Sequence, residues 1–593
     1  MESGKSSDSQ LKTSRCLGQW KTVFPLWAST YRFEYLSGDV LAGIIVAIVL
    51  VPQSMALAQL AGLPPEVGIY ASILPPVVYS LIGSSSTLSV GPVAVISLIT
   101  VRGIGELAEK GGSEYLTLAL TLAFLVGAIQ ILMGLLRLEF LVNFISHSVM
   151  SGFVSAAALL TCINQIKHIV GISIPGVEYP LENVFWLIKG IGEINPVTLI
   201  LGAGFIIFLL LYSKLILRFE KFLKLPESLH QFVIRGSPLL LMVIACLVVR
   251  AFRLDLQNEV KIVGAVPGSL PSFSFPEFDR SAIFRLMPAA FAISIVGFTE
   301  SIAMSKNLAV KTRQPIRANR ELFALGMANL SAALTSGYPV TGGMSRSVVN
   351  ADAGAKTGLA SIVCSAFVII SLLFLMPLIY YLPQAALASL IIVAVAKLID
   401  IQTLVKSWRF SKIEAFSLVV TFTAVLIVDT EWGLIIGIGI SIFIYLWRTS
   451  RPHIAIIGQI EGTDQFRNIN RHKTKTWPGL LILRIDESLY FANSVYVESY
   501  IIQKVSEQKN IKAIILECSA VNDVDLSALE LLENLIRRLG ENNIQFYFSN
   551  VKGPVMDKLK QAEFDQMVGI NCFYRSTAEA IRKSGFSKEK VAH

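Results

Sequence analysis

Long apolar runs recur between Val40 and Trp447, and they limit what this chain can fold into more than any other feature. Runs such as Leu118 to Leu136 and Ile435 to Leu446 are long or uniform enough to cross the hydrocarbon of a bilayer. Charged residues make up only 16% of the chain, whereas soluble globular domains carry about 25%. We therefore predict an α-helical polytopic membrane protein.

The apolar runs divide the chain into three parts. Residues 1–37 form a polar, basic segment that we expect in the cytoplasm, and it places the first apolar run too deep for a cleaved signal peptide. Residues 38–448 form the transmembrane part. After Arg448 charged and apolar residues alternate, which predicts a linker and a soluble domain over residues 449–593.

The transmembrane part contains about fourteen spans, judged by run length and by the Gly and Pro residues between runs. We predict a 7+7 inverted repeat, with repeat one over about 38–252 and repeat two over about 283–448. An even number of spans places both termini on one side of the membrane.

Basic residues gather in alternate loops, which predicts that these loops and both termini lie in the cytoplasm. The three strongest loops contain Lys214, Arg218, Lys221, Lys224 and Arg235; Lys306, Lys311, Arg313, Arg317 and Arg320; and Lys397, Lys406, Arg409 and Lys412. On the opposite side, Glu106, Glu109 and Glu114 outweigh Lys110. Any one basic run can be a solvated face, but the alternation favours topology. We therefore read the formal net charge of +9 as a topology signal and expect no nucleic-acid partner.

Two apolar stretches, Leu88 to Val95 and Gly337 to Ser347, are too short and too interrupted for ordinary spans. They fall third and tenth in the count, so they occupy matching positions in the two repeats, which is the pattern of a transport site. Each break exposes a helix N-terminus whose free N–H groups attract an anion. The alternative is that Pro92 and Pro339 only kink their helices.

Two ionisable residues lie at membrane depth beside these breaks. Arg346 would present a cation to an anion, because a guanidinium at this depth usually pairs with substrate, carboxylate or carbonyl. Glu300 lies in an apolar run and, beside Arg346, could bind and release a proton as the anion comes and goes. The alternatives are that Arg346 pairs permanently with Glu300 or extends to the interface, and that Glu300 caps a neighbouring helix or pairs with Lys306.

Gln53 stands beside Pro52 in the first span and offers both a donor and an acceptor to a ligand. Polar residues of this kind also hold membrane helices together. Both roles stay open for Gln53.

The motifs that contain these residues resemble those of the SulP family, the sulfate permeases, over nearly the whole chain. They are Pro52-Gln53-Ser54-Met55-Ala56, Ala61-Gly62-Leu63-Pro64-Pro65, Gly91-Pro92-Val93-Ala94, Gly297-Phe298-Thr299-Glu300-Ser301, Asn319-Arg320-Glu321-Leu322 and Ser345-Arg346-Ser347. The resemblance implies a mobile core that carries the site, a gate domain used for homodimer contacts or as a scaffold, and elevator-like alternating access.

The resemblance also implies specific roles at matching positions. Substrate contacts would be Gln53, Leu57, Val93, Met344, Ser345 and Arg346, with Glu300 in ion coupling. Sodium-coupled relatives carry an Asp at the position of Glu300 and a hydroxyl one turn later, whereas this chain has Glu300 and then Met304. Proton coupling or anion exchange is therefore favoured over sodium.

The C-terminal part alternates short strands with helices, which predicts a small α/β domain. The stretches Leu489 to Asn493 and Asp523 to Ala528 resemble a STAS domain. We expect Asp525 or Ser527 to cap the helix that starts there, with phosphorylation of Ser527 as the less favoured role. No long insert interrupts the domain, so we expect a bacterial-type protein in the inner membrane.

Our leading hypothesis is secondary transport of a small anion, with sulfate as the first candidate and a proton as coupling ion. Alternatives are bicarbonate, chloride or a dicarboxylate as cargo, an exchanger or channel, or a regulatory STAS domain on a membrane anchor. We see no nucleotide loop, nucleophile elbow or metal-ligand spacing, and so expect no enzyme, cofactor or metal site.

Overall fold

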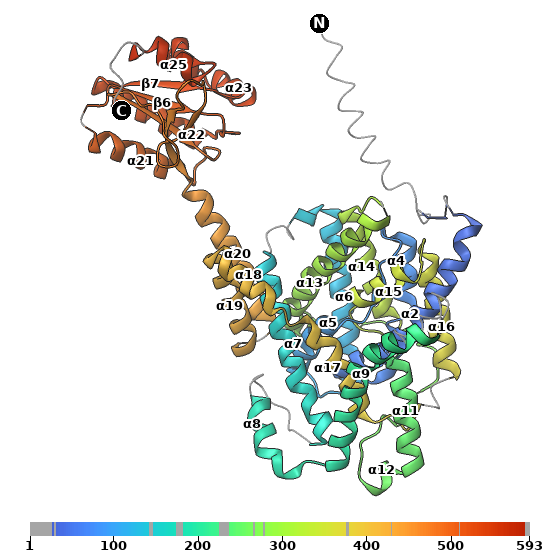
Figure 1. The fold of residues 1–593 in the computed structure, drawn as a ribbon. Helices are drawn as coiled ribbons and strands as arrows, with labels where there is room; N and C mark the ends of the chain where they lie inside the picture. The colour runs from blue at the N-terminus through green and yellow to red at the C-terminus, as the bar shows by residue number, and fades with distance from the viewer. Residues whose placement is uncertain are drawn as a thin grey trace. The chain divides into compact units, whose positions relative to one another are not determined.

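The structure is a computed structural model that describes residues 27–28, 31–140, 146–172, 182–223, 237–264, 267–276, 279–312, 314–374, 379–428, 430–508 and 510–586. Most of the predicted N-terminal segment lies outside these ranges, as do Lys224, Arg235 and Arg313 of the basic loops. Contacts divide the chain into two compact units, Met1–Ser441 and Ile442–His593 (Figure 1).

The first unit is built almost wholly of helices. Its first series is α2 (Leu36–Leu60), α3 (Pro65–Tyr70) with α4 (Leu74–Ile82), α5 (Ala94–Gly105), α6 (Ser113–Leu135), α7 (His147–Val170), α9 (Pro196–Leu223) and α11 (Ser237–Phe252). Its second series is α13 (Arg280–Thr312), α14 (Ala318–Leu334), α15 (Met344–Asp352), α16 (Leu359–Phe374), α17 (Gln384–Val395), α19 (Lys412–Ile427) and α20 (Thr430–Ser450), the last of which crosses the division between the units. Short helices fill the connections: η2 (Phe33–Tyr35), α8 (Glu182–Lys189), η4 (Gly190–Glu193), α12 (Leu254–Gln257), η6 (Ala396–Leu398) and α18 (Ile401–Phe410).

Length and composition identify the membrane spans among these helices. Within the described residues, seven helical segments are long and apolar enough to cross a bilayer, and four shorter apolar helices accompany them. When α3 and α4 count as one span, the two series hold seven segments each. The predicted helical membrane fold is confirmed.

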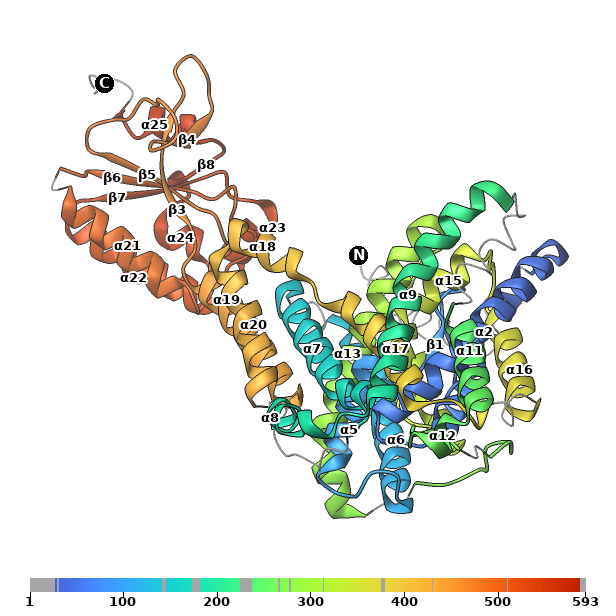
Figure 2. The same cartoon turned by 60° about the horizontal axis from the view of Figure 1, so that its bottom comes forward.

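The two predicted breaks meet inside the first unit. Val90–Gly91 forms the two-residue strand β1 and Thr341–Gly342 forms β2, and the two pair antiparallel in the register Val90 with Gly342 and Gly91 with Thr341. Figure 2 shows β1 among the helices of this unit. Each strand directly precedes the third helix of its series, and the antiparallel pairing is the arrangement that an inverted repeat requires.

Two fully buried carboxylates tie loops of the first unit to its helices. Asp39, in the first turn of α2, accepts from the N–H groups of Lys356 and Thr357 at 2.7 and 3.0 Å and from the Thr357 hydroxyl at 2.6 Å. Glu321 in α14 accepts from the Tyr79 hydroxyl, from the N–H and hydroxyl of Ser84, both at 2.7 Å, and from the N–H of Ser85. Both oxygens of each carboxylate are therefore occupied.

The second unit is an α/β domain on one sheet, as predicted. Its strands are β3 (Ile454–Gln459), β4 (Phe466–Asn468), β5 (Leu480–Ile485), β6 (Ala513–Glu517), β7 (Gln545–Ser549) and β8 (Phe573–Tyr574), in the order β4-β3-β5-β6-β7-β8. Strand β3 pairs antiparallel with both neighbours, and the remaining pairs are parallel.

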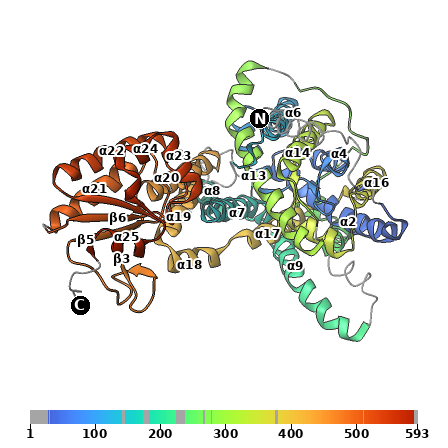
Figure 3. The same cartoon turned by 90° about the horizontal axis from the view of Figure 1, so that it is seen from above.

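Helices cover both faces of this sheet. One face carries α21 (Ser494–Glu507), α22 (Leu526–Glu541), α23 (Gly553–Gln561) and α24 (Phe564–Val568), which bury the larger apolar core (Figure 3). The other face carries α25 (Thr577–Lys583), which follows η7 (Ile570–Cys572) and β8, together with Trp477 and Phe586.

Candidate functional site

Two helix N-termini start directly after the paired breaks. Val93 is the N-cap of α5 and Gly343 the N-cap of α15, and both have extended backbone. Neither cap residue makes a side-chain capping hydrogen bond. The first N–H groups of both helices are thus left without a capping side chain, and the positive end of each helix dipole lies at the break.

Hydrogen bonds to the first break and to α13 fix the position of the second break. The N–H of Gly343 donates to the Ser89 carbonyl at 2.9 Å, and the N–H of Ser89 donates to the Ser347 hydroxyl at 2.9 Å. The N–H of Gly342 donates to the Ser301 hydroxyl at 2.9 Å. Because these contacts join β2 to the first break and to α13, the two helix ends are held in one fixed arrangement.

Asn329 of α14 holds the residue that precedes β2. Its side chain donates to the Val340 carbonyl at 3.0 Å and accepts from the Val340 N–H at 2.8 Å, and it also donates to Gln130. Thr341 adds a hydrogen bond to the Gly297 carbonyl at 2.7 Å. The irregular backbone is therefore paired and buried, as membrane depth demands.

Arg346 occupies the space between the two breaks. Its side chain is only 1% exposed. Its Nη1 donates to the Pro92 carbonyl at 2.7 Å and to Oε1 of Gln53 at 3.4 Å, while Nε and Nη2 are buried without a hydrogen-bond partner. The guanidinium fits because Gly343 has no side chain: a Cβ on Gly343 would lie 2.6 Å from Nη2.

Glu300 of α13 is the second ionisable group at the site. Its Oε2 is buried and has no hydrogen-bond partner, and Glu300 and Arg346 act on each other electrostatically. Among the described residues, no ion pair within 4.0 Å joins Glu300 to Arg346 or to Lys306. The permanent pairs considered as alternatives are therefore not formed, and the burial of Arg346 excludes its extension to the interface here.

The other predicted contact residues lie on α2, at the start of α5 and on α15. Leu57 and Val93 are almost fully buried apolar residues on α2 and at the start of α5. Met344, which is 49% exposed, and the exposed Ser345 lie in the first turn of α15. Helix α2 packs against both α5 and α15, so the predicted residues converge on one region.

Several groups at this region were missed by reasoning from the sequence. The Pro92 carbonyl and the hydroxyls of Ser301 and Thr341 carry no individual sequence signal, because their role depends on backbone pairing. Asn329 did carry one: a polar side chain within an apolar helix usually has a helix partner.

Comparison with protein families decides the identity of the first unit. Residues 36–421 match the model of the sulfate permease family, and residues 472–580 match that of the STAS domain. The chain belongs to the sulfate permease family.

Relatives in this family extend over almost the whole chain. Sulfate transporter 4.1, chloroplastic, of Arabidopsis thaliana is 36% identical over 588 residues, which cover 97% of this chain and 84% of the relative. Probable sulfate transporter 4.2 of the same plant is 35% identical over 575 residues, covering 94% and 83%. The family and these relatives are transporters, not enzymes, and they support anion transport by this chain.

A solved structure shares the fold of this sulfate permease family member. The murine solute carrier 26 family member A9 anion transporter, in the inward-facing state, aligns with a TM-score of 0.87 at 24% identity and covers 98% of this chain and 96% of that one. At this identity the likeness concerns the fold alone.

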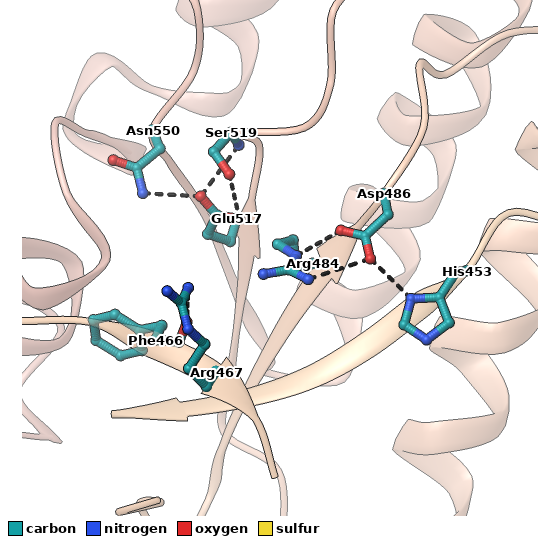
Figure 4. A network of polar contacts seen from close by, with 8 residues as sticks. All are labelled: His453, Phe466, Arg467, Arg484, Asp486, Glu517, Ser519 and Asn550. Atoms are coloured by element: carbon teal, nitrogen blue, oxygen red, sulfur yellow. Dashed lines mark hydrogen bonds and ion pairs between the residues drawn. The ribbon is translucent and has the colours of Figure 1, made fainter. Parts of the chain in front are cut away.

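The STAS domain of this permease contains a mixed-charge cluster where the strands end (Figure 4). Asp486, directly after β5, accepts from Nε of Arg484 at 2.6 Å and contacts Nδ1 of His453 at 2.8 Å. Partial burial raises the pKa of Asp486, but the hydrogen bonds from Arg484 and His453 outweigh it and hold the pKa below its ordinary value.

The buried Glu517, at the end of β6, completes this cluster. It accepts from the N–H and hydroxyl of Ser519 at 3.2 and 3.0 Å and from Nδ2 of Asn550 at 2.9 Å (Figure 4). Both oxygens of Glu517 are thus occupied by groups of its own domain.

Asp525 and Ser527 have different roles at the start of α22. Asp525 is the N-cap, and its side chain accepts from the N–H of Ala528 at 2.8 Å and from the N–H of Phe491 at 2.8 Å. Ser527 lies exposed in the first turn. Capping therefore belongs to Asp525, and phosphorylation of Ser527 stays a prediction.

Proposed function

We propose that this permease carries sulfate into the cell together with a proton. One observation supports this proposal above all others: Arg346 is buried between two paired helix N-termini with Nε and Nη2 unpartnered. A buried cation with free donors is costly unless an anion completes it, and charged hydrogen bonds are the strong ones. A tetrahedral oxyanion offers acceptors in several directions at once.

We assign substrate contact to Gln53, Leu57, Val93, Met344, Ser345 and Arg346. Arg346 supplies charge and donors, and Gln53 can donate through its amide nitrogen while its oxygen accepts from Arg346. The uncapped starts of α5 and α15 add backbone donors and dipole ends. Leu57 and Val93 form apolar walls that exclude water and strengthen these interactions.

Glu300 is the proton carrier in this proposal. A carboxylate with a buried, unpartnered oxygen near Arg346 competes with the substrate for the same positive charge. Protonation of Glu300 removes that competition, so anion and proton bind together and leave together.

Alternating access follows an elevator pattern in this proposal. The pairing of β1 with β2 and the hydrogen bonds of Gly342, Gly343 and Ser89 make both helix ends one body, which favours movement of the site as a unit. That body would be the core, and the remaining helices a gate. Exposed apolar residues of α20, such as Phe443 and Trp447, are available to lipid or to a second copy, in keeping with a homodimer.

We place the protein in the plasma membrane, as the inner membrane of a bacterial cell, with both termini in the cytoplasm. The three basic loops support this orientation through the positive-inside rule. The short uninterrupted STAS domain supports a bacterial type.

Uptake by purified protein in liposomes tests the proposal. We expect an inward proton gradient to drive accumulation of radiolabelled sulfate, and a sodium gradient alone to leave it unchanged. Unlabelled bicarbonate, chloride and a dicarboxylate are added in turn as competitors. Accumulation driven only by sodium would overturn the coupling, and stronger uptake of a competitor would replace sulfate as cargo.

The Glu300→Gln variant isolates the coupling step. We expect accumulation under a proton gradient to fall roughly tenfold or more, because the proton carrier is lost, while exchange of labelled for unlabelled sulfate continues. Glu66→Gln is the control, since Glu66 is a half-buried carboxylate of α3 that belongs to neither break. Full dependence of Glu300→Gln on the proton gradient would exclude Glu300 as carrier.

A further inference from the structure

Helix α18, which connects the fifth and sixth helices of the second series, is amphipathic. Its side chains Ile401, Val405 and Trp408 follow one another at spacings of four and three residues, so they form one apolar stripe along the helix. The three side chains are 66, 45 and 62% exposed. On another face Ser407 is buried against α7, where its hydroxyl lies 3.4 Å from that of Ser148. The apolar stripe is therefore not the face by which α18 packs on the protein.

The backbone breaks between α17 and α18, although residues Gln384–Phe410 count as one apolar segment by length and composition. Ile399 is extended, with φ −74° and ψ 104°, and Asp400 has φ −103° and ψ 81°. Figure 3 shows α18 as a separate helix beyond the end of α17. The N–H of Asp400 donates to the Ser155 hydroxyl of α7 at 3.0 Å, and α19 packs against α18. A short amphipathic helix with an exposed apolar face, between two helices of a membrane unit, is typical of the membrane interface.

Basic side chains border the apolar stripe. The exposed Lys406 and Arg409 lie on α18, and the exposed Lys397 and Lys412 lie just before and just after it. Arg409 follows Val405 by four residues and Lys406 by three, so these two cations continue from one edge of the stripe. Among the residues that the structure describes, none of the four cations forms an ion pair within 4.0 Å. They are therefore available to an anionic partner outside the chain.

Two carboxylates lie in the same stretch, and both have partners. Asp400 caps α18: its carboxylate accepts from the N–H of Thr403 at 2.9 Å and from the Thr403 hydroxyl. Glu414, in the first turn of α19, accepts from the Ser148 hydroxyl at 3.5 Å. Four basic and two acidic residues from Lys397 to Glu414 leave a net charge of +2. The acids reduce the positive charge of this surface but do not cancel it.

Helix α8 occupies the matching position in the first series, between α7 and α9, and provides an internal comparison. This helix and η4 also expose apolar side chains, namely Phe185, Ile188 and Ile191. Their charges differ from those of α18, because Glu182 and Glu193 outnumber Lys189 and leave a net charge of −1. Matching connections of an inverted repeat lie on opposite sides of the membrane. Both connections thus carry exposed apolar surface, but the one that contains α18 is basic and the one that contains α8 is not.

We propose that α18 lies in the membrane interface and binds the headgroup phosphates of anionic phospholipids, with Ile401, Val405 and Trp408 inserted at the boundary of the acyl chains. The lipid matches both properties of the helix, because its phosphates complement Lys406 and Arg409 and its chains accept the apolar stripe. Trp is enriched at this depth, and each basic residue near an anionic surface raises affinity roughly fivefold. The identity of the leaflet rests on the proposed orientation, whereas lipid binding does not depend on the proposed function.

Oxidation of Trp408 by hydroxyl radicals measures whether the apolar stripe is inserted. The full chain is placed in nanodiscs of phosphatidylcholine alone, or of equal parts phosphatidylcholine and phosphatidylglycerol, and mass spectrometry of each peptide gives the oxidation rates. At low ionic strength we expect Trp408 to react roughly threefold or more slowly in the mixed membrane, because the anionic headgroups hold α18 against the bilayer. Trp186 of α8 is the matched control and should react at the same rate in both membranes.

Charge removal then identifies the groups that recognise the lipid. In Lys406→Gln/Arg409→Gln the difference between the two membranes should largely disappear at Trp408, whereas Lys189→Gln, at the end of α8, should leave it unchanged. Salt at about 1 M should have the same effect on the wild type as the double variant, because it shortens the screening length to about 3 Å. Equal Trp408 rates in both membranes for the wild type, or a lipid dependence that survives the double variant, would overturn the proposal.

Other occupants of this face would give different results in the same experiment. A second copy of the chain on α18 would make the Trp408 rate depend on the number of chains in each nanodisc and not on the lipid. The STAS domain of the same chain would protect Trp408 equally in both membranes. Either result would overturn the proposal. Because no sulfate is present, a wild-type protein that carries no sulfate but shows the lipid dependence would refute the proposed cargo and leave the lipid-binding helix standing.

Discussion

Two clusters of charged residues in this chain are built in opposite ways. In the membrane unit, Arg346 keeps Nε and Nη2 without partners and Glu300 keeps Oε2 without one. In the STAS domain, every carboxylate oxygen of Asp486 and Glu517 accepts a hydrogen bond from its own domain. An unpaired buried polar group costs about 1–3 kcal/mol, and more when it is charged. The first cluster is therefore incomplete without a ligand, and the second is complete as it stands.

Burial alone does not distinguish a charged group that lacks hydrogen-bond partners from one that has them. Asp39 and Glu321 are as buried as Arg346, yet backbone N–H groups and hydroxyls occupy both oxygens of each. They fasten loops to helices within the same membrane unit. Unpaired polar atoms, not depth, separate the proposed transport site from these structural carboxylates.

The largest predicted effect comes from removing the incomplete cation. Arg346→Gln should lower kcat/KM for sulfate uptake by roughly 100-fold, because charged hydrogen bonds contribute about 1.5–3 kcal/mol each. Arg346→Lys should recover part of the loss, since it restores charge without the planar donor fork. Uptake of radiolabelled sulfate into liposomes measures both variants.

Arg317→Gln is the control for this prediction. Arg317 is an exposed residue at the N-cap of α14 and contributes its backbone N–H, not its side chain, to Ser84. Its loss should leave uptake within about twofold of the wild type. Normal uptake by Arg346→Gln would mean that unpaired atoms do not mark the site, and the contrast with the STAS cluster would fail.

A smaller effect should follow from displacing the cation without removing it. Gly343→Ala introduces a methyl group 2.6 Å from Nη2 of Arg346, and the flexible guanidinium must move. We expect KM for sulfate to rise roughly tenfold with folding preserved, since a group misplaced by about 1 Å costs up to 100-fold. Gly204→Ala, where a Cβ meets nothing within 4 Å, is the matched control. An unchanged KM in Gly343→Ala would show that the position of the guanidinium is unimportant.

Much of the fold was readable from the sequence because the bilayer restricts it. A run such as Leu118 to Leu136 has to become a helix, and α6 covers Ser113–Leu135. The two breaks were readable for the same reason, since Gly91, Pro92 and Gly343 interrupt helices where the bilayer tolerates irregular backbone only when protein covers it.

The hydrogen-bond partners of Arg346 could not be predicted from the sequence, because they depend on the register in which β1 pairs with β2. The pairing of Val90 with Gly342 decides that the Pro92 carbonyl faces Arg346, and no local pattern encodes it.

The smallest predicted effect concerns the STAS cluster, whose carboxylate oxygens all have hydrogen-bond partners. Asp486→Asn should leave sulfate uptake unchanged but destabilise the STAS domain by about 0.5 kcal/mol at pH 7, because the solvent-screened charged contacts with Arg484 and His453 are lost. The pKa of Asp486 is depressed in the folded state, so its contribution is present above the unfolded pKa of about 3.9 and disappears as the pH falls below it. Hydrogen exchange in β3 and β5 of the full chain should therefore differ between variant and wild type at pH 7 and 5, and converge under more acidic conditions. A loss of uptake in Asp486→Asn comparable to that of Arg346→Gln would show that a fully paired cluster also serves transport.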